Sequence, residues 1–142
     1  MEFIKALHNV INKQKRKTGT RAYFANGEVY FSRLYGYRLV DGRYVPDERY
    51  APAIRTVFEM LAAGKSLPEI KAILDGMKAR DSSNNKYSIS RICSIAERPI
   101  YCGFLYHHRR MVAVENFVPV ISLETWKKAQ RTLRIEKIKI IS

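Results

Sequence analysis

The junction between two predicted helices, AGKSLPE at residues 63–69, limits the fold of this chain more than any other stretch. Upstream of it, apolar residues recur at i, i+3, i+4 and i+7, which is the pattern of one buried helix face. Gly64 is expected to end this helix, because glycine adopts the left-handed conformation beyond a helix C-terminus at little cost. Ser66 and Glu69 then have the spacing of a capping box, and Pro68 suits a first helical turn. The junction therefore predicts two helices joined by a tight turn.

A third helix is expected beyond the second, after a polar loop. The loop covers residues 80–87, Ser88 is a suitable N-cap, and Pro99 is a suitable end for a short helix. Two helices joined by a tight turn and followed by a third are typical of helix-turn-helix-like DNA-binding proteins, an outline shared by many small helical proteins. The second helix is expected to bury Leu67, Ile70, Ala72, Ile73, Leu74 and Met77.

Charge is distributed unevenly along the chain. Lysine and arginine number 26 against 13 aspartate and glutamate, a net charge of +13. Residues 45–80, which hold the first two helices, carry six basic and five acidic side chains, whereas residues 1–44 carry nine and three. An excess of cations around a nearly neutral scaffold indicates a polyanionic partner, and we expect double-stranded DNA. A merely soluble or ribosome-adjacent basic protein is the alternative.

Three β-hairpins are predicted, of which the first, residues 23–24 with 29–31, is either a short hairpin or a loose linker, and a final helix follows. Asn26-Gly27 and Asp41-Gly42 are two-residue turn signals between short apolar or aromatic pieces. The last helix begins after Ser122. The fold class we predict is α+β, with a small helix-turn-helix-like core, β-hairpins and a terminal helix. The expected strands of the second and third hairpins cover residues 36–40 with 43–45 and residues 100–106 with 111–114, and the last helix is expected to bury Trp126, Ala129, Leu133 and Ile135.

Several classes of function are not supported by the residues present. The GKS at residues 64–66 lacks the glycine that a phosphate-binding loop needs five positions earlier, where Glu59 stands. No Ser/His/Asp or Cys/His set has a local catalytic signature. Cys93 and Cys102 are expected to be reduced, buried thiols, since their spacing to the histidines at 107–108 matches no zinc pattern. We expect no enzyme activity, no cofactor, no metal and no membrane partner.

Taken in order, several motifs resemble the recombinase domain of the large serine recombinases, the family of phage integrases and conjugative-transposon recombinases. No single motif is specific, but their order and spacing agree from about residue 35 to residue 135. The motifs are YGYRL at 35–39, VFEM at 57–60, AGKSLPEI at 63–70, RPIYCG at 98–103 and VIS at 120–122.

The resemblance implies a domain organisation and a cellular setting. Residues 1–34 would be a basic helix, over residues 2–17, and a linker, with the helix resembling the tail of that family's connecting helix. Residues 35–136 would be the DNA-binding domain and 137–142 a tail. The family's catalytic serine domain and zinc ribbon are not recognisable here, so the chain is expected to act as a monomeric, non-enzymatic fragment. Its partners would be an attachment site and other recombinase domains, in a bacterial or phage-encoded, nucleoid-associated cytoplasmic protein.

The function predicted is sequence-specific binding to one half of a double-stranded attachment site. A winged-helix transcription regulator and a protein-interaction accessory factor of a mobile element are the alternatives. Arg91 is the strongest base-reading prediction, because arginine can bind guanine with two hydrogen bonds. Cations on the N-terminal arm and at the tip of the third hairpin are expected to add affinity without sequence preference. The predicted DNA-binding residues are Lys13, Lys15, Arg16, Lys17, Arg21, Arg33, Lys65, Lys86, Tyr87, Ser88, Ser90, Arg91, Arg98, Arg109 and Arg110.

Overall fold

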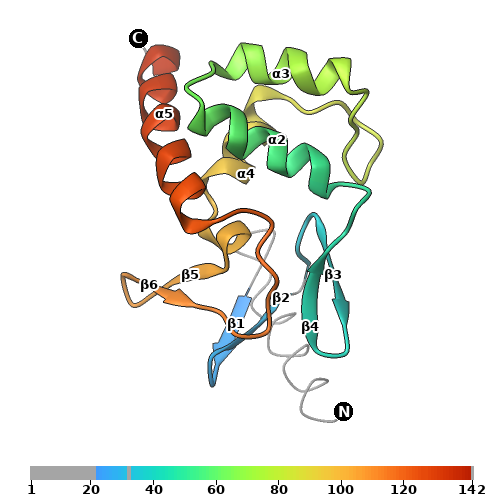
Figure 1. Cartoon of the computed structure of the whole chain (residues 1–142), viewed down its shortest axis with the longest axis vertical. Helices are drawn as coiled ribbons and strands as arrows, with labels where there is room; N and C mark the ends of the chain where they lie inside the picture. The colour runs from blue at the N-terminus through green and yellow to red at the C-terminus, as the bar shows by residue number, and fades with distance from the viewer. Residues whose placement is uncertain (1–21, 32, 142) are drawn as a thin grey trace.

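The computed structural model describes residues 22–31 and 33–141. Helices fill the upper half of the molecule in Figure 1, and three separate two-stranded antiparallel hairpins lie below them. The α+β class and the order of hairpins and helices predicted for this part of the chain are confirmed. The helix predicted over residues 2–17 lies outside the described residues.

The helical half contains four α-helices. The turn between the first two helices is built as predicted. Gly64 is left-handed, with a φ of 86°. The Ser66 hydroxyl accepts a hydrogen bond from the Glu69 amide, and the Glu69 carboxylate accepts one from the Ser66 amide, both at 3.2 Å. The end of the first helix and the start of the second are therefore set by residues of the turn itself. The helices are α2 (Ala51–Ala62), α3 (Leu67–Gly76), α4 (Ile89–Glu97) and α5 (Leu123–Ile141), with a 3-10 helix η1 (Pro99–Cys102) after α4.

The core lies between α2 and the helices around it. Ile54, Val57, Phe58 and Leu61 of α2 are fully buried, and α5 packs along this helix with Trp126, Ala129 and Leu133. Three residues expected in the core are exposed instead: Ala72, Met77 and Ile135, the last two at 45% and 57%. Ala72 and Ile135 are each two positions away from a buried residue of the same helix. Two positions correspond to a rotation of about 200°, so both side chains point away from the core. The helix α5 also continues through position 136 to Ile141, so residues 137–141, expected in a tail, are helical.

The hairpins have tight two-residue turns. Asn26 and Gly27, Asp41 and Gly42, and His108 and Arg109 all have positive φ, which is the type I′ geometry that suits twisted strands. The strands are β1 (Ala22–Ala25) with β2 (Glu28–Phe31), β3 (Tyr37–Val40) with β4 (Arg43–Pro46), and β5 (Phe104–His107) with β6 (Arg110–Ala113).

The strand predicted from residue 100 begins later than expected. Ile100, Tyr101 and Cys102 are all buried, and they form the 3-10 helix η1 instead of a strand. Gly103 then takes a left-handed φ of 85° and packs against Pro119 before β5 starts. The Arg-Pro at 98–99 therefore starts a helical turn rather than an extended strand.

The segment between β6 and α5 joins the hairpins to one another. The Asn116 amide side chain pairs with Val29, accepting its N–H and donating to its C=O, both at 2.8 Å. The backbone carbonyl of Asn116 accepts a hydrogen bond from the Tyr44 amide at 2.8 Å. The Tyr44 hydroxyl in turn accepts one from the Phe31 amide at 2.9 Å. Hairpin β1–β2 thus packs against the same core as the helices.

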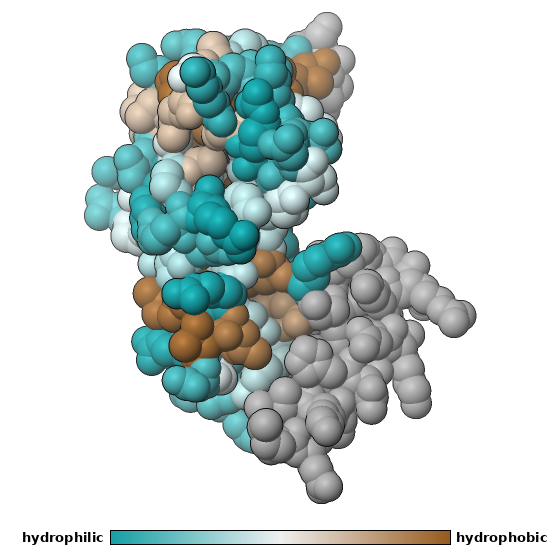
Figure 2. Space-filling view, turned by 90° about the vertical axis from the view of Figure 1, so that its right-hand side faces the viewer, coloured by the Kyte–Doolittle hydropathy of each residue, from teal (hydrophilic) through white to brown (hydrophobic). Residues whose placement is uncertain are grey.

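The surface reflects this division into two halves. Figure 2, which looks at the side that carries β3 and β4, shows a compact apolar patch in the lower half and mostly hydrophilic side chains above it. On this side hairpin β3–β4 exposes Leu39 and Val40, at 40% and 39%. Within the described residues, no helix is long and apolar enough to cross a membrane.

One carboxylate of α5 holds the start of α3. Glu136 is buried, accepts the Leu67 amide at 2.8 Å on one oxygen and binds the Lys139 ammonium at 2.9 Å with the other. These two donors keep the pKa of the Glu136 carboxyl below its ordinary value of 4.5. A depressed carboxyl pKa contributes stability above the ordinary pKa, and that stability is lost as pH falls through the folded-state pKa.

The variant Glu136→Gln is therefore expected to lower the free energy of unfolding by about 1 to 2 kcal/mol at pH 7. The difference from wild type should shrink below pH 4.5, where the wild-type carboxylate is protonated on unfolding. Urea unfolding at pH 7 and at two acidic pH values measures both effects. Glu124→Gln, whose carboxylate forms an exposed pair with Lys128, is the control and should change little. If Glu136→Gln were less stable than wild type by the same free energy at every pH, the loss would come from packing rather than from charge.

Candidate nucleic-acid interface

Helix α4 is fixed at both ends, and one polar face is left open. The Ser88 hydroxyl caps its start by accepting the Arg91 amide at 3.1 Å, as predicted. Two side chains of α5 bind the last carbonyls, Gln130 at the Ala96 oxygen (2.7 Å) and the Trp126 indole at the Arg98 oxygen (3.1 Å). The buried side carries Ile92, Ile95 and Ala96, and the exposed positions are Ser90, Ser94 and Glu97.

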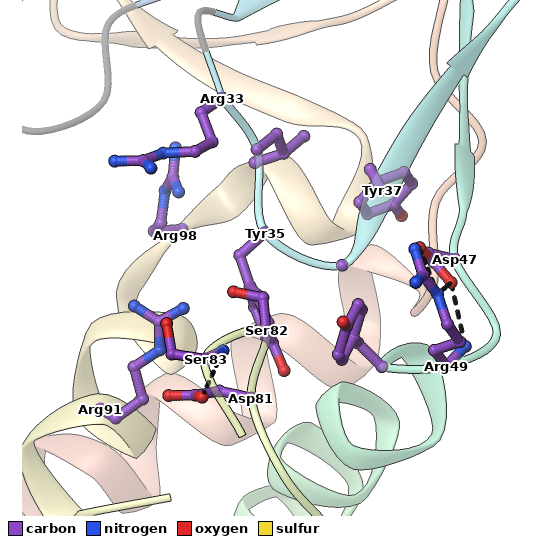
Figure 3. A pocket seen from close by; sticks show the side chains of 13 residues that line it. Arg33, Tyr35, Tyr37, Asp47, Arg49, Asp81, Ser82, Ser83, Arg91 and Arg98 are labelled. Carbon is purple, nitrogen blue, oxygen red and sulfur yellow. Dashed lines mark hydrogen bonds and ion pairs between the residues drawn. The ribbon is translucent and has the colours of Figure 1, made fainter. Parts of the chain in front are cut away.

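A cleft of about 570 Å³ opens beside α4. Its walls are the segment 33–37, three residues just before α2 (47, 49 and 50), the loop at residues 81–83 and two arginines from α4 and its end (Figure 3). Four arginine side chains line it, and Figure 3 shows Arg33, Arg91 and Arg98 on the same side of the cleft. The fourth is Arg49.

The two carboxylates of the cleft are already occupied by the protein. Asp47 pairs with Arg49 at 2.7 Å, and this guanidinium holds the pKa of the Asp47 carboxyl below its ordinary value. Asp81 accepts the amides of Ser83 and Asn85, both at 2.9 Å, and so shapes the loop that leads to α4. Within residues 22–31 and 33–141, the other three arginines of the cleft have no carboxylate partner.

Tyrosine side chains pack beneath the arginines of the cleft. The Arg91 guanidinium lies over the Tyr35 ring, with its carbon 4.6 Å from the ring centroid. Tyr87, predicted to contact DNA, is instead 1% exposed, and its hydroxyl contacts that of Tyr35 and donates to the Arg80 carbonyl at 3.3 Å. Burial raises the pKa of Tyr87 to about 12, so it stays a neutral core residue. Tyr87 was predicted to contact DNA because it leads into the third helix, but the structure places its side chain in the core.

The other predicted residues that the structure describes occupy four regions. Arg33 and Arg98 share the cleft with Arg91, while Lys86 and Ser90 are exposed at the start of α4, where Ser88 serves as the cap. Lys65 lies in the α2–α3 turn, and Arg109 and Arg110 lie at the tip of β5–β6, so none of these three lines the cleft. The predicted arm residues Lys13, Lys15, Arg16, Lys17 and Arg21 lie outside the described part of the chain.

Sequence reasoning missed several residues of this region. Ser94 is exposed one turn beyond Ser90, a spacing that the helix prediction already contained. Tyr35 and Arg49 could not be placed at the cleft from the sequence, because the hairpin β3–β4 and the start of α2 bring them there only in the folded chain.

In the described part of the chain, the cysteines and histidines are not grouped into a metal site. Cys102 is buried and donates to the Pro99 carbonyl at 3.1 Å, and burial raises the pKa of its thiol to about 11. Cys93 is only partly buried, and burial raises its pKa as well. Among the residues that the structure describes, no three His, Cys, Asp or Glu side chains are grouped to hold a metal ion.

Comparison with solved structures shows the same fold in two proteins. One is described as the crystal structure of a large serine recombinase (LSR)–DNA complex, with a TM-score of 0.58, 19% identity, and cover of 81% of this chain and 33% of the other. The second comes from work on the sequence requirements of the Listeria innocua prophage attP site, with a TM-score of 0.58, 20% identity, and cover of 88% and 50%. This chain thus spans a third and a half of their lengths. The search of curated proteins found no match.

The family comparison covers most of the helical half and the third hairpin. A family model described as Recombinase matches residues 48–136, from the approach to α2 into the second half of α5. The match includes α4, Arg91 and Arg98, whereas hairpins β1–β2 and β3–β4 precede it. Because more than half of the chain is matched, it belongs to the Recombinase family.

Proposed function

We propose that this chain is the DNA-recognition domain of a large serine recombinase, and that it binds one half of a double-stranded attachment site with sequence preference. The observation that carries the proposal is the cleft, directly beside the exposed face of α4, with three arginines that have no carboxylate partner among the residues that the structure describes. Membership of the Recombinase family and the shared fold with an LSR–DNA complex support it.

The roles that we propose for individual residues follow from the geometry of α4. Its first turn and exposed stripe, with Lys86, Ser90 and Ser94, would enter the major groove, where base edges carry a distinct pattern of donors and acceptors. Contacts to phosphates would orient the domain without reading sequence. The tip of β5–β6, with Arg109 and Arg110, and the N-terminal arm would add affinity from charge. Strand cleavage would be the task of a different domain of the parent recombinase, acting in the cytoplasm at the bacterial chromosome or phage DNA.

Selection from a random duplex library, followed by titration, tests this function. The chain is expected to enrich one motif and to bind it at least about tenfold more tightly than a scrambled duplex. Its affinity should fall steeply between 50 and 200 mM salt, as expected when several phosphates are neutralised. Fluorescence anisotropy of labelled duplexes measures both quantities.

Two outcomes would contradict the proposal. Equal binding to selected and scrambled duplexes would leave a non-specific DNA-binding domain. An affinity that does not respond to salt, or no binding to any duplex, would favour the protein-interaction alternative, since apolar interfaces respond little to ionic strength.

A further inference from the structure

We propose that Arg33, Arg91 and Arg98 form one row of phosphate contacts that holds the sugar–phosphate backbone of a single DNA strand, and that Arg91 belongs to this row rather than to the base-reading face. The inference rests on the proposed function and deepens it. It assigns a ligand group, the phosphodiester, to the cleft, and it changes the role predicted for Arg91 from the sequence.

The charge of the cleft is the first argument. Three guanidinium groups share a space of about 570 Å³, while the cleft's own carboxylates bind Arg49 and backbone amides. Holding like charges close together costs electrostatic energy in the free protein, and an anion in the cleft offsets this cost. Guanidinium groups match the oxygens of a phosphate with paired hydrogen bonds.

The fixed position of Arg91 is the second argument. Its guanidinium lies on Tyr35, and Tyr35 is itself held by the core: its carbonyl accepts the Tyr101 hydroxyl at 2.9 Å and its ring packs against Tyr50 at 5.2 Å. The Nε atom of Arg91 is buried and has no hydrogen-bond partner within the described residues, so the terminal nitrogens are the ones that face the cleft. A side chain folded onto Tyr35 does not extend from the exposed stripe of α4, where a base reader must project.

The placement of the other two arginines is the third argument. Arg98 lies over Phe31 with its carbon 5.8 Å from the ring centroid, and its backbone is fixed by the indole of Trp126 at 3.1 Å. Arg33 is exposed and lines the same side of the cleft as Arg98 in Figure 3. Arg91 and Arg98 leave the helix about 10 Å apart along its axis. One strand of B-DNA carries a phosphate per 3.4 Å of axis, so such a row spans more than one phosphate.

Substitution of Arg91 and Arg98 tests the proposed row of phosphate contacts. Arg91→Ala and Arg98→Ala, in the full chain, are each expected to weaken binding to the selected duplex and to a scrambled duplex by the same factor, about tenfold at low salt. Each should also lower the salt slope by about one. Arg134→Ala, at an exposed position of α5 outside the cleft, is the matched control and should change affinity much less. Arg91→Lys, which keeps the charge, should restore most of the salt slope.

A second readout locates the contacts on the DNA. Single phosphates of the selected duplex are replaced by neutral methylphosphonates, and wild-type binding should weaken at two or three neighbouring positions of one strand. At those positions the replacement should have less effect on Arg91→Ala or Arg98→Ala, because the contact is already lost. Thermal unfolding by circular dichroism confirms that each variant is folded.

The outcomes separate this inference from the proposed function. A loss confined to the selected duplex would make Arg91 a base reader and overturn the inference. Wild-type binding with a steep salt slope, but with both variants equal to Arg134→Ala, would also overturn it and leave the proposed function standing. Failure of the wild-type chain to bind any duplex would overturn the proposed function itself.

Discussion

The variant Asn116→Ala is expected to lose about 3 kcal/mol of unfolding free energy, which is a large fraction of the stability of a domain of this size. Val29 is fully buried, and both its amide and its carbonyl pair with the Asn116 side chain. Alanine leaves these two backbone groups without partners, and each buried unsatisfied group costs about 1 to 3 kcal/mol. Urea unfolding followed by circular dichroism measures the loss.

Two further variants give this prediction its control. Asn85→Ala removes an exposed amide from the loop before α4 and should change stability little. Asn116→Asp keeps an acceptor for the Val29 amide and loses the donor to the Val29 carbonyl, so it should retain part of the stability. Equal stability of Asn116→Ala and wild type would show that the two hydrogen bonds between Asn116 and Val29 have no weight in stability.

The variant Gly36→Ala is expected to lose roughly 2 to 4 kcal/mol, because two costs act at one position. The first is conformational, since Gly36 has φ of 86° and an L side chain is strained there. The second is steric, since an added Cβ would overlap the Ile54 side chain in the core. Gly36 also lies between Tyr35 and Tyr37 in the cleft lining, so duplex binding should weaken as well. Thermal and urea unfolding measure the stability loss.

Gly42→Ala separates the two costs. Gly42 has a similar φ of 78°, but no atom lies within 4 Å of an added Cβ. This control should therefore lose only the conformational cost, about 1 kcal/mol. If Gly36→Ala lost no more than Gly42→Ala, the contact with Ile54 would have no weight in stability.

The parts of the fold that were predictable are those decided by neighbours in the sequence. A capping box needs only Ser66 and Glu69, and a type I′ turn needs only a dipeptide such as Asp41-Gly42. The 3-10 turn at residues 99–102 was not predictable in this way. It exists because Ile100, Tyr101 and Cys102 all find room in the core, and that room is made by α2, α5 and hairpin β3–β4.

The candidate site was predictable in its residue types and not in its geometry. Charge and position on the third helix pointed to Arg91 and Arg98, and both line the cleft. The direction of the Arg91 side chain depends on Tyr35, which lies 56 positions earlier in the chain and reaches α4 only through tertiary packing. Tyr87 was misplaced for the same reason, since its burial depends on the contact with Tyr35.

The exposed stripe of α4, formed by Ser90 and Ser94, affects how readily a protein with this fold acquires new binding preferences. Ser90 and Ser94 are exposed and are not part of the hydrophobic core, while the helix is held by its cap at Ser88 and by Trp126 and Gln130 at its other end. Substitutions on this stripe therefore carry little penalty in folding. If the stripe reads bases as proposed, new target preferences are accessible by few mutations, and a library randomised at these two positions is the economical starting point for retargeting.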